Sequence, residues 1–255
     1  MTPINTFAEF PKGKKIYFAS DFHLGAPDFD TSLQREKKII RWLDQISNDA
    51  LAVFLVGDIF DFWFEYKHSI PKGHIRIQGK LAELSDKGIS IVIFTGNHDM
   101  WMFDYFKQQF GAVIHRNPQC YNLGGRRVLI GHGDGLGPGD SAYKIYKKVF
   151  QSPICQWLFK WLHPDVGMSI AKYWSAKSRM NNSADIEHEA EWLIEHCNDI
   201  EDIDHHDFYV FGHRHLATKL QLNENSIYIN LGEWIEKCTY AVFDGNSFEL
   251  NAFDK

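Results

Sequence analysis

Histidine, aspartate and asparagine side chains lie in five short segments of this chain. The segments are DFH, GDIFD, GNHD, GHGD and GHRH, which contain Asp21, His23, Asp58, Asn97, His98, Asp99, His132, His213 and His215. Imidazole nitrogens together with carboxylate and amide oxygens suit divalent metals such as manganese, iron or zinc. None of the segments contains cysteine, which argues against a structural zinc site. These residue types therefore predict a metal site able to do chemistry.

Each segment taken alone has an ordinary structural explanation. A single histidine at a strand end is usually structural, and an aspartate or asparagine beside glycine is often a turn or cap residue. Five such segments in equivalent positions favour a shared site instead. In DxH and HxH the alternation of an extended backbone sends both side chains to one side. The adjacent glycines allow the backbone to turn where a strand becomes a loop.

Apolar runs precede these segments and predict the strands that position them. KKIYFAS (14–20), ALAVFLV (50–56) and ISIVIFT (89–95) are continuously apolar for most of their length. Residues 31–47 and 79–87 read as helices between them, and Asp30 or Thr31 is expected to cap the first. Continuous apolar strands indicate a sheet that is covered on both faces. Ligand sites of such α/β sheets form at the carboxyl ends of the strands.

The second half of the chain changes character twice. YNLGG and RVLIG predict a hairpin across Gly124-Gly125, residues 141–203 read as several helices, and strands resume at DFYVFGHRH. We expect one domain, 1–255, with a helical insert at about 139–203 that lies over the metal edge. Within the insert an apolar face, formed by Phe150, Ile154, Trp157, Leu158 and Trp161, suits either a buried core or an acyl-chain groove. Trp63 and Phe64 have the same two readings.

Composition limits the choice of partners and location. The 255 residues are 44% hydrophobic and carry a formal charge of −6, so nucleic acid is not an expected partner. The sequence has no signal-peptide pattern and no membrane-span pattern, which predicts a cytoplasmic protein. Four widely spaced cysteines suggest reduced structural thiols. The eight histidines outside the five segments are expected at the surface or in packing. The oligomeric state is not predicted.

The ordered segments resemble the calcineurin-like metallophosphoesterase superfamily, whose pattern is DxH, GDxxD, GNH followed by an acid, GHxx and GHxH. The resemblance spans about residues 16–215. It implies an α/β fold, the four-layer αββα sandwich of two mixed sheets with helices outside. It also implies two divalent ions, for which Mn²⁺ is the first expectation and iron or zinc are alternatives.

Carried over residue by residue, the resemblance implies a ligand set for each ion. One ion takes Asp21, His23 and His215, the other takes Asn97, His132 and His213, and Asp58 bridges them. Such ion pairs activate water and hold the phosphoryl oxygens during an in-line displacement. The resemblance gives His98 the role of neutralising developing charge or protonating the leaving group. Asp99 is expected to orient His98.

DFWFEYK (61–67) and the segment after His132 resemble the bacterial UDP-2,3-diacylglucosamine hydrolases of lipid A synthesis. These enzymes cleave a pyrophosphate to give UMP and 2,3-diacylglucosamine 1-phosphate, and their helical insert is a lid that holds the acyl chains. The resemblance implies a nucleotide-linked glycolipid substrate. The apolar face of the insert with its flanking lysines also suits peripheral contact with the cytoplasmic face of the inner membrane. The substrate-binding residues that it implies are Asp140, Tyr143, Lys177, Ser178 and Arg179. Well-known members of that family have arginine at the position of His98.

Two other functions remain open at this stage. One is a general phosphodiesterase or nuclease, which would turn over nucleic acid or cyclic nucleotides. The other is a binding scaffold that has the fold without catalysis. A scaffold is expected to show degraded ligands, whereas this chain has a suitable residue at all seven ligand positions.

Overall fold

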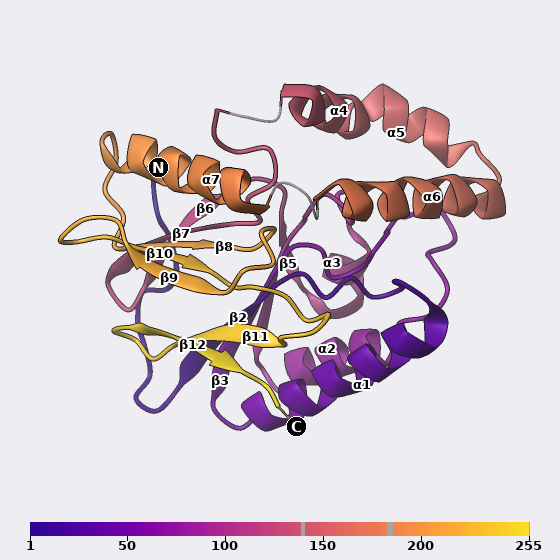
Figure 1. Ribbon diagram of the computed structural model, residues 1–255. Helices are drawn as coiled ribbons and strands as arrows, with labels where there is room; N and C mark the ends of the chain where they lie inside the picture. Colours follow the sequence, from indigo (N-terminus) through magenta and orange to yellow (C-terminus); the bar gives the residue numbers. More distant parts are fainter. Residues whose placement is uncertain (139–140, 183–185, 255) are drawn as a thin grey trace.

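Two six-stranded mixed sheets pack against each other in the computed structural model, which describes residues 1–138, 141–182 and 186–254 (Figure 1). The first sheet, in the order β12-β11-β2-β3-β4-β5, consists of β2 (Lys15–Ala19), β3 (Ala50–Val56), β4 (Ser90–Phe94), β5 (Val113–His115), β11 (Thr239–Phe243) and β12 (Phe248–Ala252). The second sheet, in the order β1-β6-β7-β8-β10-β9, consists of β1 (Ile4–Phe7), β6 (Gln119–Leu123), β7 (Arg126–Gly131), β8 (Phe208–Phe211), β9 (Thr218–Gln221) and β10 (Ile227–Asn230).

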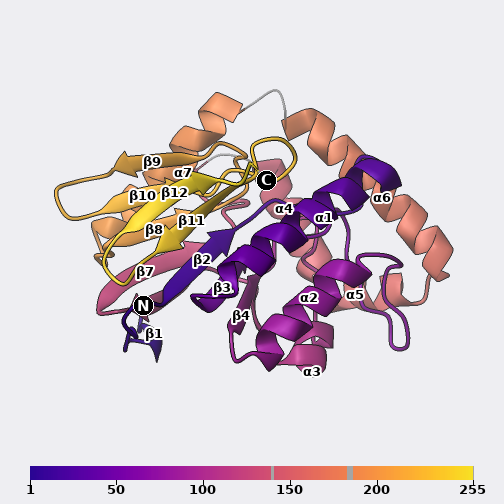
Figure 2. The same ribbon diagram turned by 90° about the horizontal axis from the view of Figure 1, so that it is seen from below.

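Helices cover the outer face of each sheet. The first sheet is covered by α1 (Phe29–Ile46), α2 (Ile75–Asp86) and α3 (Tyr105–Phe110) (Figure 2), and the second by α7 (Ile186–Glu201). The layers are thus helix, sheet, sheet and helix. The expected αββα sandwich is confirmed.

The strand β2 shows why its apolar run is continuous. Tyr17 and Ala19 pack with α1 and α2 on one face, while Ile16 and Phe18 pack between the sheets on the other. Because successive strand side chains point to opposite faces, a strand covered on both needs apolar residues at every position. The strands β3 and β4 follow the same rule, so one core lies between the two sheets and another between the first sheet and its helices.

Helix α1 forms because its apolar residues recur on one face. Trp42, Leu43 and Ile46 are buried against the first sheet. The helix begins earlier than the sequence suggested, and the expected cap at Asp30 or Thr31 is wrong. Asp28 is the cap, and its Oδ1 accepts a hydrogen bond of 2.9 Å from the Thr31 backbone amide. The Asp28 side chain, two residues before Asp30, thereby provides an acceptor for a backbone amide of the first turn.

The helices between β7 and β8 fall into two groups (Figure 1). Helix α7 packs Leu193 and Cys197 against the second sheet. The other three, α4 (Ser141–Gln151), α5 (Pro153–Lys160) and α6 (Pro164–Asn182), lie beyond the end of the sandwich. We call α4, α5 and α6 together the cap helices. No helix among the described residues is long and apolar enough to cross a bilayer.

The cap helices leave large apolar side chains exposed. Ile154, Trp157, Leu158 and Trp161 are all more than half exposed, so the reading of this stripe as buried core is wrong for these four residues. Trp63 and Phe64 show the opposite outcome. Both are buried, and Trp63 stacks on Phe60 in the core beneath α2 and α3, with ring centroids 4.4 Å apart.

Candidate active site

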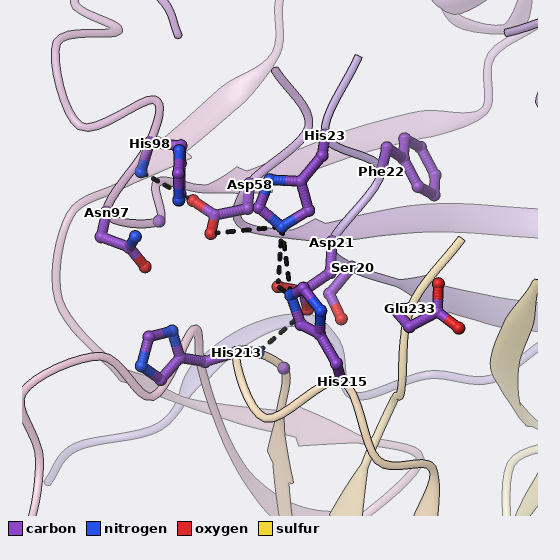
Figure 3. A network of polar contacts seen from close by, with 12 residues as sticks. Ser20, Asp21, Phe22, His23, Asp58, Asn97, His98, His213, His215 and Glu233 are labelled. Carbon is purple, nitrogen blue, oxygen red and sulfur yellow. Dashed lines mark hydrogen bonds and ion pairs between the residues drawn. The ribbon is translucent and has the colours of Figure 1, made fainter. Parts of the chain in front are cut away.

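The polar segments meet at one edge of the sandwich. In the first sheet β2, β3 and β4 are parallel, and in the second β7 and β8 are parallel. Loops after these strands carry all five segments and bond across the two sheets (Figure 3). The His213 amide, after β8 of the second sheet, donates to Asp21 Oδ2, after β2 of the first, over 2.9 Å. Within the second sheet the Gly212 amide donates to the His132 carbonyl over 2.9 Å. Topology therefore brings residues nearly 200 positions apart into contact.

One group of candidate ligands consists of Asp21, His23 and His215. Their ligand atoms lie within 4.8 Å of one another. Asp21 Oδ1 is 3.2 Å from His215 Nε2, and the two Nε2 atoms of His23 and His215 are 3.1 Å apart. Asp21 is fully buried, yet its Oδ1 accepts no hydrogen bond. A buried carboxylate oxygen without a hydrogen bond, facing two imidazole nitrogens, fits a divalent cation.

A second group consists of Asp58, His132 and His213, whose ligand atoms also lie within 4.8 Å of one another. His132 Nε2 is 3.3 Å from Asp58 Oδ2 and 3.3 Å from Asn97 Oδ1. The other ring nitrogen of His132, Nδ1, donates to the Val56 carbonyl over 2.8 Å. This bond places the hydrogen on Nδ1 and directs the Nε2 lone pair into the site, as metal-binding histidines require.

Asp58 lies between the two groups. Its Oδ2 is 3.8 Å from His23 Nε2 in the first group and 3.3 Å from His132 Nε2 in the second. Its Oδ1 accepts a 2.8 Å hydrogen bond from the His98 backbone amide, which fixes the carboxylate. One carboxylate that faces both ligand groups is suited to bridge two ions. The described residues thus fit a pair of divalent metals.

The backbone at this edge is unusual. Asp21, His23, Asp58, His213 and His215 all have positive φ, between 44° and 69°. For residues other than glycine this region costs on the order of 1 kcal/mol or more and is concentrated at functional sites.

Glycine is required beside these residues because the ligands approach so closely. A Cβ at Gly96 would overlap the Asp58 carboxylate, and a Cβ at Gly57 would overlap the His132 ring. Gly57 also has a φ of +87°. The glycines of the motifs therefore provide space for the ligands as well as freedom to turn.

Electrostatic effects keep the carboxylates charged. Burial alone would raise the pKa of Asp58, but the facing imidazoles of His132 and His98 hold that pKa well below its usual range. Burial likewise opposes ionisation of Asp21, while His215 lowers its pKa to about 2. Burial would lower the pKa of His132, yet Asp58 raises it to about 10. The two carboxylates therefore stay ionised and favour positive charge between them, which the protonated His132 carries here.

His213 and Asp99 shift in the opposite sense. Burial, together with the neighbouring His132, lowers the pKa of His213 to about 4, so its imidazole is neutral near pH 7. Burial and the nearby Asp58 raise the pKa of Asp99 to about 7. A neutral imidazole is the form that binds a metal.

The contacts of His98 differ from those expected, because Asp99 is not its partner. His98 Nδ1 lies 3.0 Å from the Asp61 carbonyl oxygen and 2.9 Å from Ser175 Oγ. The Asp99 oxygens instead accept hydrogen bonds of 2.7 Å from the Gly96 amide and 2.8 Å from the Ile59 amide. Asp99 therefore ties the loop after β4 to the loop after β3, and the expected orientation of His98 by Asp99 is wrong.

The substrate residues expected in the insert are only partly described. Asp140 and the side chains of Lys177, Ser178 and Arg179 lie outside the described residues. Tyr143 donates a 2.6 Å hydrogen bond from its hydroxyl to Asp134 Oδ2. Lys147 Nζ is 2.7 Å from the same oxygen, so α4 is anchored to the loop that follows His132.

Histidines outside the motifs have structural contacts where they are described. His206 is buried against Tyr209, and His115 Nε2 is 2.7 Å from the Tyr121 hydroxyl. All four cysteines are free thiols; Cys120, Cys197 and Cys238 are buried, and Cys155 is half-buried.

Sequence reasoning missed two partners of His98. Asp61 is the last residue of GDIFD, and its place in that motif was a usable signal. Its Oδ1 lies 3.7 Å from His98 Nδ1 and 3.8 Å from His23 Nδ1. Ser175 has no signal of its own, because 77 residues separate it from His98.

Comparison with known proteins agrees with the site. Residues 14–217 match the model of the calcineurin-like phosphoesterase family, and the chain belongs to that family. The expected class, a metal-dependent phosphoric ester hydrolase, is confirmed. The UDP-2,3-diacylglucosamine hydrolase of Porphyromonas gingivalis is 35% identical over 261 residues, covering 94% of this chain and 98% of that protein. The UDP-2,3-diacylglucosamine hydrolase of Histophilus somni is 28% identical over 244 residues, covering 93% and 99%.

Proposed function

We propose that this protein hydrolyses the pyrophosphate of UDP-2,3-diacylglucosamine and releases UMP and 2,3-diacylglucosamine 1-phosphate. The observation that carries the proposal is the meeting of two ligand groups at Asp58. The relatives named above support the choice of substrate, because they align with nearly the whole chain.

Seven residues would hold two divalent ions, with Mn²⁺ as the first choice. They are Asp21, His23 and His215 for one ion, Asn97, His132 and His213 for the other, and Asp58 between them. Bound divalent ions supply Lewis acidity toward phosphoryl oxygens and make a coordinated water more acidic. Asp58 is ionised and His213 is neutral near pH 7, as ligands must be, whereas His132 would release a proton on binding an ion.

His98 would act on the phosphate that leaves. The hydrogen on its Nδ1 is taken up by the Asp61 carbonyl, which leaves Nε2 to exchange a proton or to face the developing charge. Relatives in the hydrolase family that have arginine here would offer a permanent cation. In this chain the imidazole of His98 could also donate a proton. The arginine of the relatives and the histidine of this chain would thus stabilise the same developing negative charge.

The insert at about 139–203 would select the substrate. The cap helices carry exposed apolar side chains, including Trp157 and Trp161, and such surface suits two acyl chains. Helix α6 reaches the metal edge at Ser175. Tyr143 and Asp140 near the start of the insert would contact the substrate. On α6, Ser178 would contact the substrate, and Lys177 and Arg179 would contact its phosphate.

The same surface supports peripheral contact with a bilayer. Exposed tryptophans with Lys160 nearby are typical of segments that lie at the interface of an anionic membrane. The proposed substrate is a lipid, so contact between the protein and the bilayer would shorten the path of the substrate from the membrane to the site. Sedimentation with anionic vesicles tests this part: no binding at low salt would exclude it.

The direct test is a UMP-release assay with Mn²⁺ across a panel of nucleotide-linked substrates. We expect release of UMP from UDP-2,3-diacylglucosamine and little reaction with cyclic nucleotides or single-stranded DNA. Turnover of an aryl phosphodiester without UMP release would exclude the substrate and leave the reaction class intact. Absence of all turnover, with less than about one metal per chain after Mn²⁺ supplementation, would favour a scaffold.

A further inference from the structure

Ser175 links the cap helices to the proposed catalytic imidazole. The serine lies on α6, and its residue is 7% exposed. Its Oγ is 2.9 Å from His98 Nδ1 and donates a 2.9 Å hydrogen bond to the Asp61 carbonyl. Three segments therefore meet at one ring nitrogen: the loop after β3, the loop after β4 and α6.

The hydrogens at this junction can be assigned from donor and acceptor chemistry. The Asp61 carbonyl can only accept, so a bare Nδ1 at 3.0 Å would place two lone pairs against each other. Nδ1 must carry the hydrogen. The Ser175 hydroxyl gives its own hydrogen to the Asp61 carbonyl, and its oxygen can accept from Nδ1 at 2.9 Å.

The face of α6 that carries Ser175 is built for close approach. Gly167, Ala171 and Ser175 are spaced four residues apart and are all buried. Residues four apart lie on one face of a helix, and small side chains allow its backbone to come near its neighbour. At Gly167 an added Cβ would overlap the Tyr66 hydroxyl and touch Phe159. Ser175 is thus the polar residue at one end of the closely packed face of α6.

We propose that Ser175 is a positioning residue that fixes the orientation of the His98 imidazole and couples the placement of α6 to the chemical step. The inference rests on the proposed role of His98 in hydrolysis. Substrate that engages the cap helices would then set the geometry of the imidazole through this one hydroxyl. Nothing in the sequence pattern of the metal site assigns such a role to the insert.

The first test is spectroscopic and does not depend on turnover. In protein loaded with diamagnetic Zn²⁺, the Nδ1 proton of His98 should give a resolved signal that exchanges slowly with water. Ser175→Ala should shift this signal and speed its exchange. The matched control is Ser169→Ala on the same helix, where the hydroxyl bonds to the Asp165 carbonyl and faces solvent. An unchanged signal in Ser175→Ala would overturn the inference.

The second test separates positioning from simple support of the fold. Alanine has a high helix propensity, so Ser175→Ala should leave α6 intact. We expect kcat to fall ~2- to 10-fold with KM nearly unchanged, as for one lost hydrogen bond. In a His98→Ala background the same substitution should have no further effect on kcat. Equal effects in both backgrounds would contradict positioning through His98.

The two tests also separate this inference from the proposed substrate. Both UDP-2,3-diacylglucosamine and an aryl phosphodiester should be assayed. Turnover of the aryl ester alone, with a Ser175 effect that depends on His98, would reject the substrate and retain the inference. If neither ester reacts, the proposed function fails, and the proton signal of His98 still decides whether Ser175 holds the ring.

Discussion

The metal edge of the sandwich and the cap helices are opposite in character. At the edge, polar residues are buried: Asp58 is 1% exposed and Asp21 is fully buried. In the cap helices, apolar residues are exposed: Trp157 is 58% exposed and Trp161 is 75% exposed. Buried polar groups are stable only with partners that satisfy them, and exposed apolar groups lie ready for partners outside the fold. The contrast separates a region suited to chemistry from one suited to recognition.

The contrast extends to how each region is held. Strand ends, αL backbone and hydrogen bonds between the sheets fix the metal edge from several directions. The described cap helices are attached on one side, by hydrogen bonds such as the 2.7 Å bond from the Trp101 indole to the Phe150 carbonyl and by packing of Phe159 on Phe64 and Trp101. Changes at the edge should therefore alter catalysis strongly, and changes on the exposed helices should alter substrate affinity.

The largest effect is expected for Asp58→Ala. Removing the carboxylate that faces both ligand groups should lower kcat by at least ~10³-fold, because metal Lewis acidity is worth several kcal/mol. Metal analysis should show fewer than two ions per chain, and circular dichroism should show whether the fold is retained. A folded variant that retains both metals and full turnover would contradict the assignment of Asp58.

The next largest effect is expected for His98→Ala. His98 belongs to neither of the two proposed ligand sets, although it also lies near His23 and Asp61 in a third group that could hold an ion. The variant should therefore keep two ions and lose ~10²- to 10⁴-fold in kcat if the imidazole is a general acid. Steady-state kinetics with parallel metal analysis checks both parts. Loss of metal along with activity would show that His98 supports the ions instead.

A pair of tryptophan substitutions compares the two regions by stability. Trp42→Ala removes a fully buried side chain beneath the first sheet and should lower the free energy of unfolding by ~3–5 kcal/mol. Trp161→Ala removes an exposed side chain and should change the free energy of unfolding by less than about 0.5 kcal/mol. Urea unfolding measures both. A large loss for Trp161→Ala would mean that the cap helices pack more tightly than their exposure indicates.

The sequence predicted the metal edge well because its signals are local. Asp21, Asp58 and His132 each follow directly an apolar run, and parallel strands bring their carboxyl ends together. Three groups among the described residues could hold an ion: two consist of expected ligands, and the third is His23, Asp61 and His98.

Other parts of the structure could not be predicted, because they depend on contacts between residues that are distant in the sequence. Residues 4–7 and 113–115 form β1 and β5, which pair at sheet edges and are too short to give a periodic signal. His98 contacts Ser175 and the Asp61 carbonyl, and both partners come from distant positions in the chain. Asp99 was misassigned because proximity in sequence suggested a contact that the loop geometry does not make.

The most direct measurement compares two substrates that share the reacting pyrophosphate and differ in acyl chains. With the same metal loading, kcat/KM should be determined for UDP-2,3-diacylglucosamine and for UDP-N-acetylglucosamine. Because each buried methylene contributes about 0.8 kcal/mol, we predict a preference for the acylated substrate of at least ~10²-fold. Trp161→Ala should reduce that preference. Equal kcat/KM values for the two substrates would contradict the division between a catalytic edge and a recognition surface.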